Sequence, residues 1–263
     1  MSIAENIAIV RARIQAAARR AGREPAAITL MAVSKTFPPE AIREAYAAGI
    51  RVFGENRVQE FAGKADALRD LAEAEWHLIG HLQSNKAARA AELFGAIDSV
   101  DSVRLAERLD AAGDAVSGET AAGDAVSRVA TEKRIPLAKR VPLPVLIEIN
   151  VGGEAAKSGL APDAIELELI LSLAPGWKNL TIRGLMTVPP YTEDPEGARP
   201  YFRRLREIRD GIAARRLASV AMDVLSMGMS HDFEVAIEEG STCVRVGTAI
   251  FGERPKAIAE VRS

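Results

Sequence analysis

Apolar residues recur at helical spacing near the start of the chain. Between Ser2 and Ala21 they stand at Ile3, Ile7, Val10, Ile14 and Ala17. Arg11, Arg13, Arg19 and Arg20 lie mostly on the other side of the same turns. This pattern predicts an amphipathic helix whose apolar side covers the body of the protein.

Short apolar runs then alternate with helical patterns along the rest of the chain. Each run has the length of a buried strand and is followed by glycine or polar residues. The predicted strands are Ile28–Val33, Ile50–Phe53, Trp76–Ile79, Ala96–Val100, Pro144–Val151, Thr181–Met186, Val224–Met227 and Cys243–Val246. Eight such units close a parallel barrel, so we expect an α/β fold, a single (β/α)8 TIM barrel over residues 1–263 with an extra N-terminal helix. A doubly wound open sheet is the alternative.

One region interrupts this alternation. The heptapeptide AAGDAVS occurs at Ala111–Ser117 and again at Ala121–Ser127. Two copies are too few for a solenoid, which needs about three units to bury a core. We therefore interpret residues 113–140 as an exposed insertion produced by local duplication. Because it joins a helix to the next strand, it is expected on the amino-terminal face of the barrel, away from the ligand-binding face.

The amino-acid composition limits the kinds of partner that the protein is expected to bind. The formal net charge of the 263 residues is -2, whereas nucleic-acid-binding proteins usually carry a basic excess. The single cysteine, Cys243, cannot form an intrachain disulfide, and charges between Met1 and Arg13 do not fit a signal peptide. No stretch approaches the roughly 20 apolar residues of a membrane-spanning helix. We expect a cytoplasmic protein that binds neither nucleic acid nor membrane.

Lys35 is the first candidate for chemistry. It follows the predicted strand Ile28–Val33 and precedes the proline pair Pro38-Pro39. Ligands bind at the carboxyl ends of strands in barrels and in open α/β sheets, because loops and helix N-termini meet there. Since most lysines in such loops are simply solvated, Lys35 needs support from other residues.

Glycine and hydroxyl residues supply that support at the last two strands. They are Ser226, Gly228 and Ser230 at strand seven, and Gly247 and Thr248 after strand eight. Barrels often bind phosphate at this position, through backbone N–H groups and a helix N-terminus. A phosphate site with Lys35 across the barrel suggests a phosphorylated aldehyde that forms a Schiff base with the lysine amine.

Arg245 is a further candidate. It stands two residues before Gly247, so strand alternation directs both toward the same side, the mouth of the barrel. A buried arginine needs an acceptor. A pyridine nitrogen or a ligand carboxylate would serve, and so would a structural ion pair with Glu148; the sequence leaves both interpretations open.

Seven sequence motifs, which occur in the same order as in a known family, make the resemblance to that family specific. They are AVSKTFPPEAI, FGENRVQE, WHLIGHLQSNK, INVGGEAAKSG, GLMTVPP, LSMGMSHDFEVAI and VRVGTAIFGER, and they span nearly the whole chain outside residues 113–140. The sequence resembles the pyridoxal-phosphate homeostasis protein family, whose members resemble the N-terminal barrel domain of alanine racemase. The family pattern usually has serine where this chain has Gly152.

The resemblance implies a cofactor, pyridoxal 5'-phosphate, and a set of residues that bind it. Lys35 would carry the cofactor as an aldimine, and Arg245 would face the pyridine nitrogen. The phosphate would be held by Ser226, Gly247 and Thr248. Asn56 and Met186 would line the ring pocket, and Met227 belongs to the same site.

The expected activity is low, because the cofactor would lack a protonated ring nitrogen and nearby acid and base groups. An arginine does not readily give up a proton, so the ring nitrogen it faces stays unprotonated and the ring is a weaker electron sink. Racemisation then needs strong acid and base groups at the substrate. In the racemases that the barrel resembles, a second domain supplies a tyrosine, and only seventeen residues follow Val246 here. Tyr46 and Tyr201 are predicted to pack in helices, which leaves Tyr191 as a candidate.

We therefore expect a protein of pyridoxal phosphate homeostasis that stores, buffers or delivers the cofactor without efficient catalysis and without catalytic residues. Its partners would be the cofactor and pyridoxal-phosphate-dependent apoenzymes, and it would be a monomer or a weak dimer. An amino-acid racemase and a class I aldolase-like barrel that uses Lys35 directly are the alternatives. His77 and His81 are four residues apart, but Gly80 between them argues against the helix that a metal site of that spacing needs.

Overall fold

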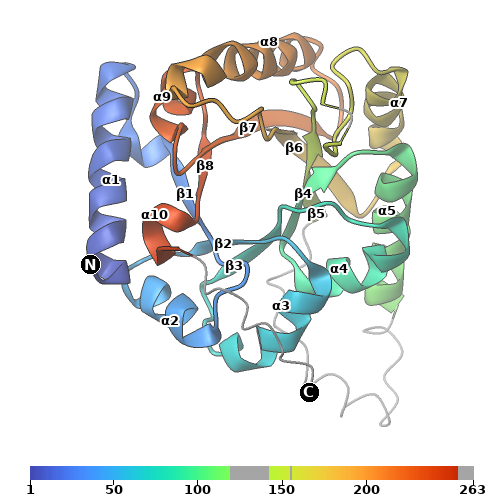
Figure 1. Ribbon diagram of the computed structural model, residues 1–263. Helices are drawn as coiled ribbons and strands as arrows, with labels where there is room; N and C mark the ends of the chain where they lie inside the picture. Colours follow the sequence, from blue (N-terminus) through green and yellow to red (C-terminus); the bar gives the residue numbers. More distant parts are fainter. Residues whose placement is uncertain (119–141, 155, 254–263) are drawn as a thin grey trace, which may run out of the picture.

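Eight parallel strands form a closed barrel in chain order (Figure 1). The computed structural model describes residues 1–118, 142–154 and 156–253. The strands are β1 (Thr29–Val33), β2 (Val52–Glu55), β3 (Glu75–Leu78), β4 (Ala96–Val100), β5 (Leu143–Glu148), β6 (Leu180–Met186), β7 (Val220–Met229) and β8 (Cys243–Val246). Because β8 pairs with β1, the predicted barrel is confirmed and the open sheet is excluded.

Helices surround the barrel (Figure 1). The α-helices are α1 (Ile3–Arg20), α2 (Pro39–Ala47), α3 (Val58–Lys64), α4 (Ala87–Leu93), α5 (Val103–Gly118), α7 (Ile165–Leu173), α8 (Arg199–Ala214), α9 (Phe233–Glu238) and α10 (Thr248–Phe251). The 3-10 turns are η1 (Pro25–Ala27), η2 (Ala65–Leu68), η3 (Ser84–Lys86), η4 (Ala174–Gly176) and η5 (Pro195–Ala198).

Two strands extend beyond their predicted ends. β2 reaches Glu55 and β7 reaches Met229, although the sequence predicts loops at Gly54-Glu55 and Gly228-Met229. Glycine and acidic residues have low strand propensity, so the local pattern ends too early. Pairing across the barrel overrides it, since Glu55 is in register with Leu78 and Met229 with Arg245.

The extra N-terminal helix closes the seam between β8 and β1. A capping box starts α1: the Ser2 hydroxyl accepts a hydrogen bond from the Glu5 N–H, and the Ser2 N–H donates to the Glu5 carboxylate. The helix packs between α9 and α2 and also contacts α10 (Figure 1). Since α10 has only four residues, α1 provides the cover that the outer side of this seam requires.

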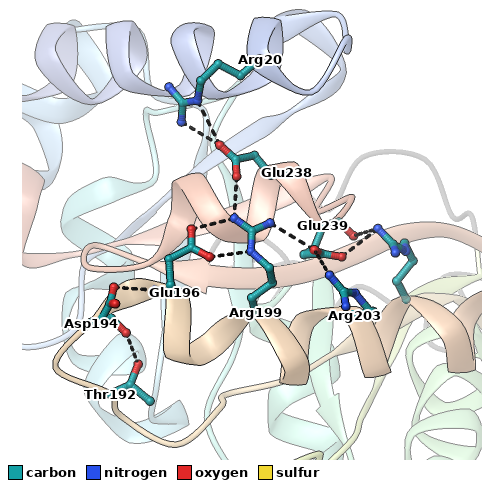
Figure 2. A network of polar contacts seen from close by, with 9 residues as sticks. Arg20, Thr192, Asp194, Glu196, Arg199, Arg203, Glu238 and Glu239 are labelled. Carbon is teal, nitrogen blue, oxygen red and sulfur yellow. Dashed lines mark hydrogen bonds and ion pairs between the residues drawn. The ribbon is translucent and has the colours of Figure 1, made fainter.

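A network of ion pairs links α1, α8 and α9 outside the barrel (Figure 2). Arg199 at the start of α8 contacts Glu196, Glu238 and Glu239 at 2.6, 2.7 and 3.1 Å. Arg20 of α1 reaches the same Glu238 at 2.9 Å. These pairs fix the outer helices around the strands that end in the predicted phosphate site.

The core has two layers that differ in polarity. Between strands and helices lies a continuous apolar cluster that includes Ala32, Phe53, Trp76 and Met227. The barrel interior instead contains buried polar side chains, namely Asp98, Glu148, Ser226 and Arg245. Buried charges are retained where a site needs them, so the interior is the place to look for function.

The insertion lies mostly outside the described residues. Its first residues, from Gly113, continue α5 to Gly118, and residues 119–141 are not described. Its exposure and its place on the amino-terminal face stay predictions. Among the described residues, no helix has the length and apolar character needed to cross a membrane.

Candidate functional site

Lys35 lies in the tight turn that follows β1. The Ser34 N–H donates to the Gly54 carbonyl of β2 at 3.0 Å, and the Phe37 N–H donates to the Ser34 carbonyl at 3.2 Å. Lys35 is half-buried, and Thr36 beside it has φ +66°. Residues other than glycine rarely adopt this conformation, so contacts from outside the turn must hold it.

Helix α3 provides those contacts. Lys64 Nζ donates to the Ser34 carbonyl at 3.0 Å, on one side of Lys35. On the other side, the Glu60 carboxylate accepts a hydrogen bond from the Thr36 N–H. The backbone around Lys35 is therefore anchored before and after the lysine.

The turn after β8 forms a cradle of backbone N–H groups. Gly247 and Ala249 both donate to the Ser230 hydroxyl, at 3.3 and 3.4 Å. Two N–H groups that converge on one oxygen at the start of α10 are the arrangement that binds a phosphate oxygen. The sequence points to Gly247 and Thr248 here and includes Ser230 among the hydroxyl residues at strand seven, although the phosphate residues implied by the resemblance do not include Ser230.

The Lys35 turn is adjacent to this cradle. A Cβ built on Gly247 would lie 3.5 Å from the Val33 carbonyl oxygen, and Val33 precedes Lys35 by two residues. The prediction that the lysine lies across the barrel from the phosphate turn is wrong, because closure of the barrel pairs β1 with β8. The two elements of the site are neighbours.

Arg245 points into the barrel and is 3% exposed. Its guanidinium donates to the Ser226 hydroxyl at 2.7 Å and to the Thr187 carbonyl at 2.6 Å. Burial lowers the pKa of the guanidinium, although neighbouring acids oppose this. The acceptors that the structure shows for Arg245 are thus Ser226 and Thr187, and no ion pair with Glu148 is formed among the described residues.

Three expected binding residues occupy different sides of β6 and β7. Ser226 lies inside the barrel, where its hydroxyl accepts from Arg245 rather than facing the N–H cradle. Met186 is fully buried and is in register with both Glu148 and Ser226. The Met227 side chain belongs to the outer apolar cluster, so only its backbone is available to a ligand in the mouth.

Asn56 follows β2 with a buried side-chain oxygen, Oδ1, that has no hydrogen-bond partner. Gly80 packs against its backbone: a Cβ at Gly80 would lie 2.3 Å from the Asn56 carbonyl oxygen. Only glycine permits this approach. An unsatisfied buried acceptor in a site is consistent with a donor supplied by a ligand.

Two histidines each pair with an aspartate. His77 Nδ1 lies 3.1 Å from the Asp98 carboxylate inside the barrel, and His81 Nδ1 lies 3.1 Å from that of Asp101 at the mouth. Burial alone would lower the pKa of His77, but Asp98 and then Glu75 outweigh it and raise the pKa to about 9. No group of three metal-ligating side chains occurs in the residues that the structure describes.

The loop after β5 lines an open hollow of about 540 Å³. Gly152 lies on its lining, and a Cβ there would be 2.6 Å from Pro190 Cγ. A serine at this position would need Pro190 to move. The departure from the family pattern at Gly152 thus accompanies a close contact between the loops that follow β5 and β6.

The closed barrel with a lysine after β1 belongs to the class of barrels formed by the N-terminal domain of alanine racemase. The family model described as "Alanine racemase, N-terminal domain" matches residues 6–255. An alanine racemase from Clostridium difficile has the same fold, with a TM-score of 0.64 at 13% identity over 96% of this chain and 58% of the racemase.

Closer relatives are more specific. The pyridoxal phosphate homeostasis protein of Aquifex aeolicus is 46% identical over 97% of this chain and 99% of its own length. That of Pseudomonas aeruginosa is 45% identical over 96% of each chain. PipY of Synechococcus elongatus, solved with PLP bound, is 35% identical, with a TM-score of 0.73 over 95% of this chain and 100% of PipY. This chain belongs to the family of pyridoxal phosphate homeostasis proteins.

Proposed function

We propose that this protein binds pyridoxal 5'-phosphate in the mouth of the barrel and takes part in its homeostasis by storing, buffering or delivering it. One observation carries the proposal: the Lys35 turn is adjacent to the N–H cradle after β8. The aldehyde and the phosphate arm of this cofactor stand on neighbouring carbons of the pyridine ring. An amine beside a phosphate cradle therefore fits it better than an amine on the opposite wall.

The described residues fit the rest of the cofactor. Gly247 and Thr248 would hold the phosphate with backbone N–H groups, joined by the Ser230 hydroxyl. Arg245 would lie beneath the ring nitrogen, and Ser226 would orient the guanidinium by the hydrogen bond it already accepts. When bound, the cofactor supplies an aldehyde that condenses reversibly with the amine of Lys35.

Three further residues would complete the pocket. Asn56 has a buried oxygen ready to accept a hydrogen bond from the ligand. Met186 would contact the ring, and Met227 would contribute through its backbone. The relatives support cofactor binding in general, since those compared above are named for pyridoxal phosphate homeostasis and PipY was solved with PLP bound.

We infer that turnover of substrates is inefficient. The Arg245 guanidinium is a donor only and keeps its proton, so it does not protonate the ring nitrogen that it faces. Tyr191, the tyrosine candidate for an acid or base, is 79% exposed in the loop after β6 and lies beside His231, so it is not held in a buried site. Tyr46 packs against Arg51, and Tyr201 lies in the first turn of α8, outside the barrel.

The remaining expectations belong to the same proposal. The protein acts in the cytoplasm, where the buried thiol of Cys243 stays reduced. Its partners are the cofactor and pyridoxal-phosphate-dependent apoenzymes, and it is a monomer or a weak dimer.

Titration of the purified protein with pyridoxal 5'-phosphate, followed by visible absorption, tests the proposal. The wild type and the control Lys178→Ala, which alters an exposed lysine, should become yellow with stoichiometric uptake. Lys35→Ala should be colourless once gel filtration has removed the free cofactor, which is itself yellow. The loaded protein should also activate a pyridoxal-phosphate-dependent apoenzyme. A wild type that takes up no cofactor would refute the proposal, and steady exchange of the α-hydrogen of amino acids would favour the racemase alternative.

A further inference from the structure

Glu148 ends β5 with a carboxylate oxygen that no group in the described part of the chain satisfies. Glu148 is 8% exposed, and its Oε2 atom is buried without a hydrogen-bond partner. Arg245, a cation inside the barrel, donates its bonds to Ser226 and Thr187 instead. An unpaired buried carboxylate is costly, so this group calls for a proton or for a cationic ligand.

A second acid stands beside it. Val100 of β4 is in register with Ile147 of β5, so Asp101 and Glu148 follow at neighbouring strand ends. The Asp101 carboxylate lies 3.1 Å from His81 Nδ1, and the His81 side chain is 53% exposed. The pair of acids is thus reached from solvent past an imidazole at the rim of the mouth.

The charges around Glu148 explain its protonation. Burial and then the charge of Asp101 raise the pKa of the Glu148 carboxyl, Arg245 and His81 oppose them, and the result is about 7. Near neutral pH the carboxyl is therefore divided between its two forms. A cation at Oε2 would favour the ionised form and lower this pKa.

The geometry favours one class of cation. Gly159 packs behind Glu148, since a Cβ there would lie 3.1 Å from Glu148 Cγ, and this backing limits movement of the side chain. A primary ammonium group is compact, carries three donors and can satisfy Oε2 while facing Asp101. We propose that Glu148, supported by Asp101, forms a subsite in the mouth for the ammonium group of a small primary amine.

The subsite adds a second ligand to the proposed function, and its role in releasing the cofactor rests on that proposed function. If the cofactor occupies the same mouth, an amine bound at Glu148 lies in the compartment where Lys35 holds the aldehyde. Such an amine is the kind of group that competes with Lys35 for it. Release of the cofactor would then depend on small amines as well as on protein partners.

Amine binding to the full chain without added cofactor tests the subsite separately from cofactor binding. The probe is propylammonium, with propanol as an uncharged control of similar shape. The 13C resonance of the Glu148 carboxyl should report a pKa that propylammonium lowers and propanol leaves unchanged. Binding measured by calorimetry should strengthen as pH rises through about 7, because the carboxylate forms while the amine keeps its proton until about pH 10.

Variants sharpen the test. Glu148→Gln should weaken propylammonium binding by at least about tenfold, because the pairing charge is removed. Glu168→Gln, which alters an exposed acid on α7, should bind as the wild type does. Equal binding by Glu148→Gln, or a Glu148 carboxyl pKa unchanged by saturating propylammonium, would overturn the proposal. If Glu148→Gln fails to fold, the carboxyl titration of the wild type decides alone.

Discussion

Lys64 Nζ lies 2.8 Å from Glu55 Oε1, and both side chains are buried beneath the turn that carries Lys35. The Ser34 hydroxyl donates to the same Glu55 oxygen at 2.5 Å. Burial raises the pKa of the Glu55 carboxyl, although Lys64 and Ser34 act to lower it. This ion pair couples β2 and α3 to the backbone on which the lysine amine depends.

Breaking the pair from one side should be costly. Lys64→Met leaves the Glu55 carboxylate buried without its cation, and we expect a loss of about 3–5 kcal/mol in the free energy of unfolding. The double variant Glu55→Gln, Lys64→Met should recover part of it. Arg89→Met, which removes an exposed pair with Glu92, is the control and should cost no more than about 1 kcal/mol in urea unfolding. A Lys64→Met loss as small as the control's would contradict the role given to the pair.

Gly80 should be required for the position of Asn56. In Gly80→Ala the new methyl group meets the Asn56 carbonyl oxygen at 2.3 Å, so the loop after β2 must shift. We expect weaker binding of pyridoxal 5'-phosphate together with lower stability. Gly211→Ala is the matched control, because a Cβ at that exposed helical position meets nothing within 4 Å. The control should bind normally and gain about 0.5–1 kcal/mol in stability. Normal binding by Gly80→Ala would exclude Asn56 from the site.

Ser230 should act on the phosphate rather than on the ring. Its hydroxyl already meets the Gly247 and Ala249 N–H groups, so Ser230→Ala removes one polar contact from the cradle. A hydrogen bond to a charged group contributes about 1.5–3 kcal/mol. The affinity for pyridoxal 5'-phosphate should therefore fall by about tenfold or more, while that for pyridoxal, which lacks the phosphate, should not change. Equal losses for both ligands, measured by equilibrium dialysis, would place Ser230 elsewhere in the binding process.

The sequence predicted the order of strands and helices well because the apolar runs are short and sharply bounded. Strands β4 and β8 have the predicted limits. The sequence did not predict which strand ends are neighbours in the barrel. Lys35 was expected across the barrel from Gly247, since a linear pattern does not show that closure brings the first and last strands together.

The contacts between buried polar side chains could not be predicted from the sequence either. The Asp101 carboxylate pairs with His81, and Ser102 caps α5 by accepting from the Leu105 N–H at 3.2 Å. Nothing in the spacing of Glu55 and Lys64 shows that they meet, because the contact forms only once α3 folds back on β1 and β2. Such pairs depend on tertiary packing rather than on local propensity.

His77 should make stability depend on pH above neutrality. Its pKa in the folded protein is about 9, higher than its ordinary value near 6.5, so the charged imidazole stabilises the fold. This contribution is complete below about pH 6.5 and is lost as pH rises through 9. His77→Gln should flatten the pH dependence of urea unfolding in that window. An unchanged slope would show that Asp98 does not hold the proton on His77.

The central claim is a covalent bond between Lys35 and the aldehyde of pyridoxal 5'-phosphate, and its most direct test is chemical. The protein is loaded with the cofactor, reduced with borohydride, digested and examined by mass spectrometry. The account predicts a stoichiometric reduced adduct on the peptide that contains Lys35, and none on other lysines. A principal adduct on Lys86 or Lys157, with Lys35 unmodified, would contradict it.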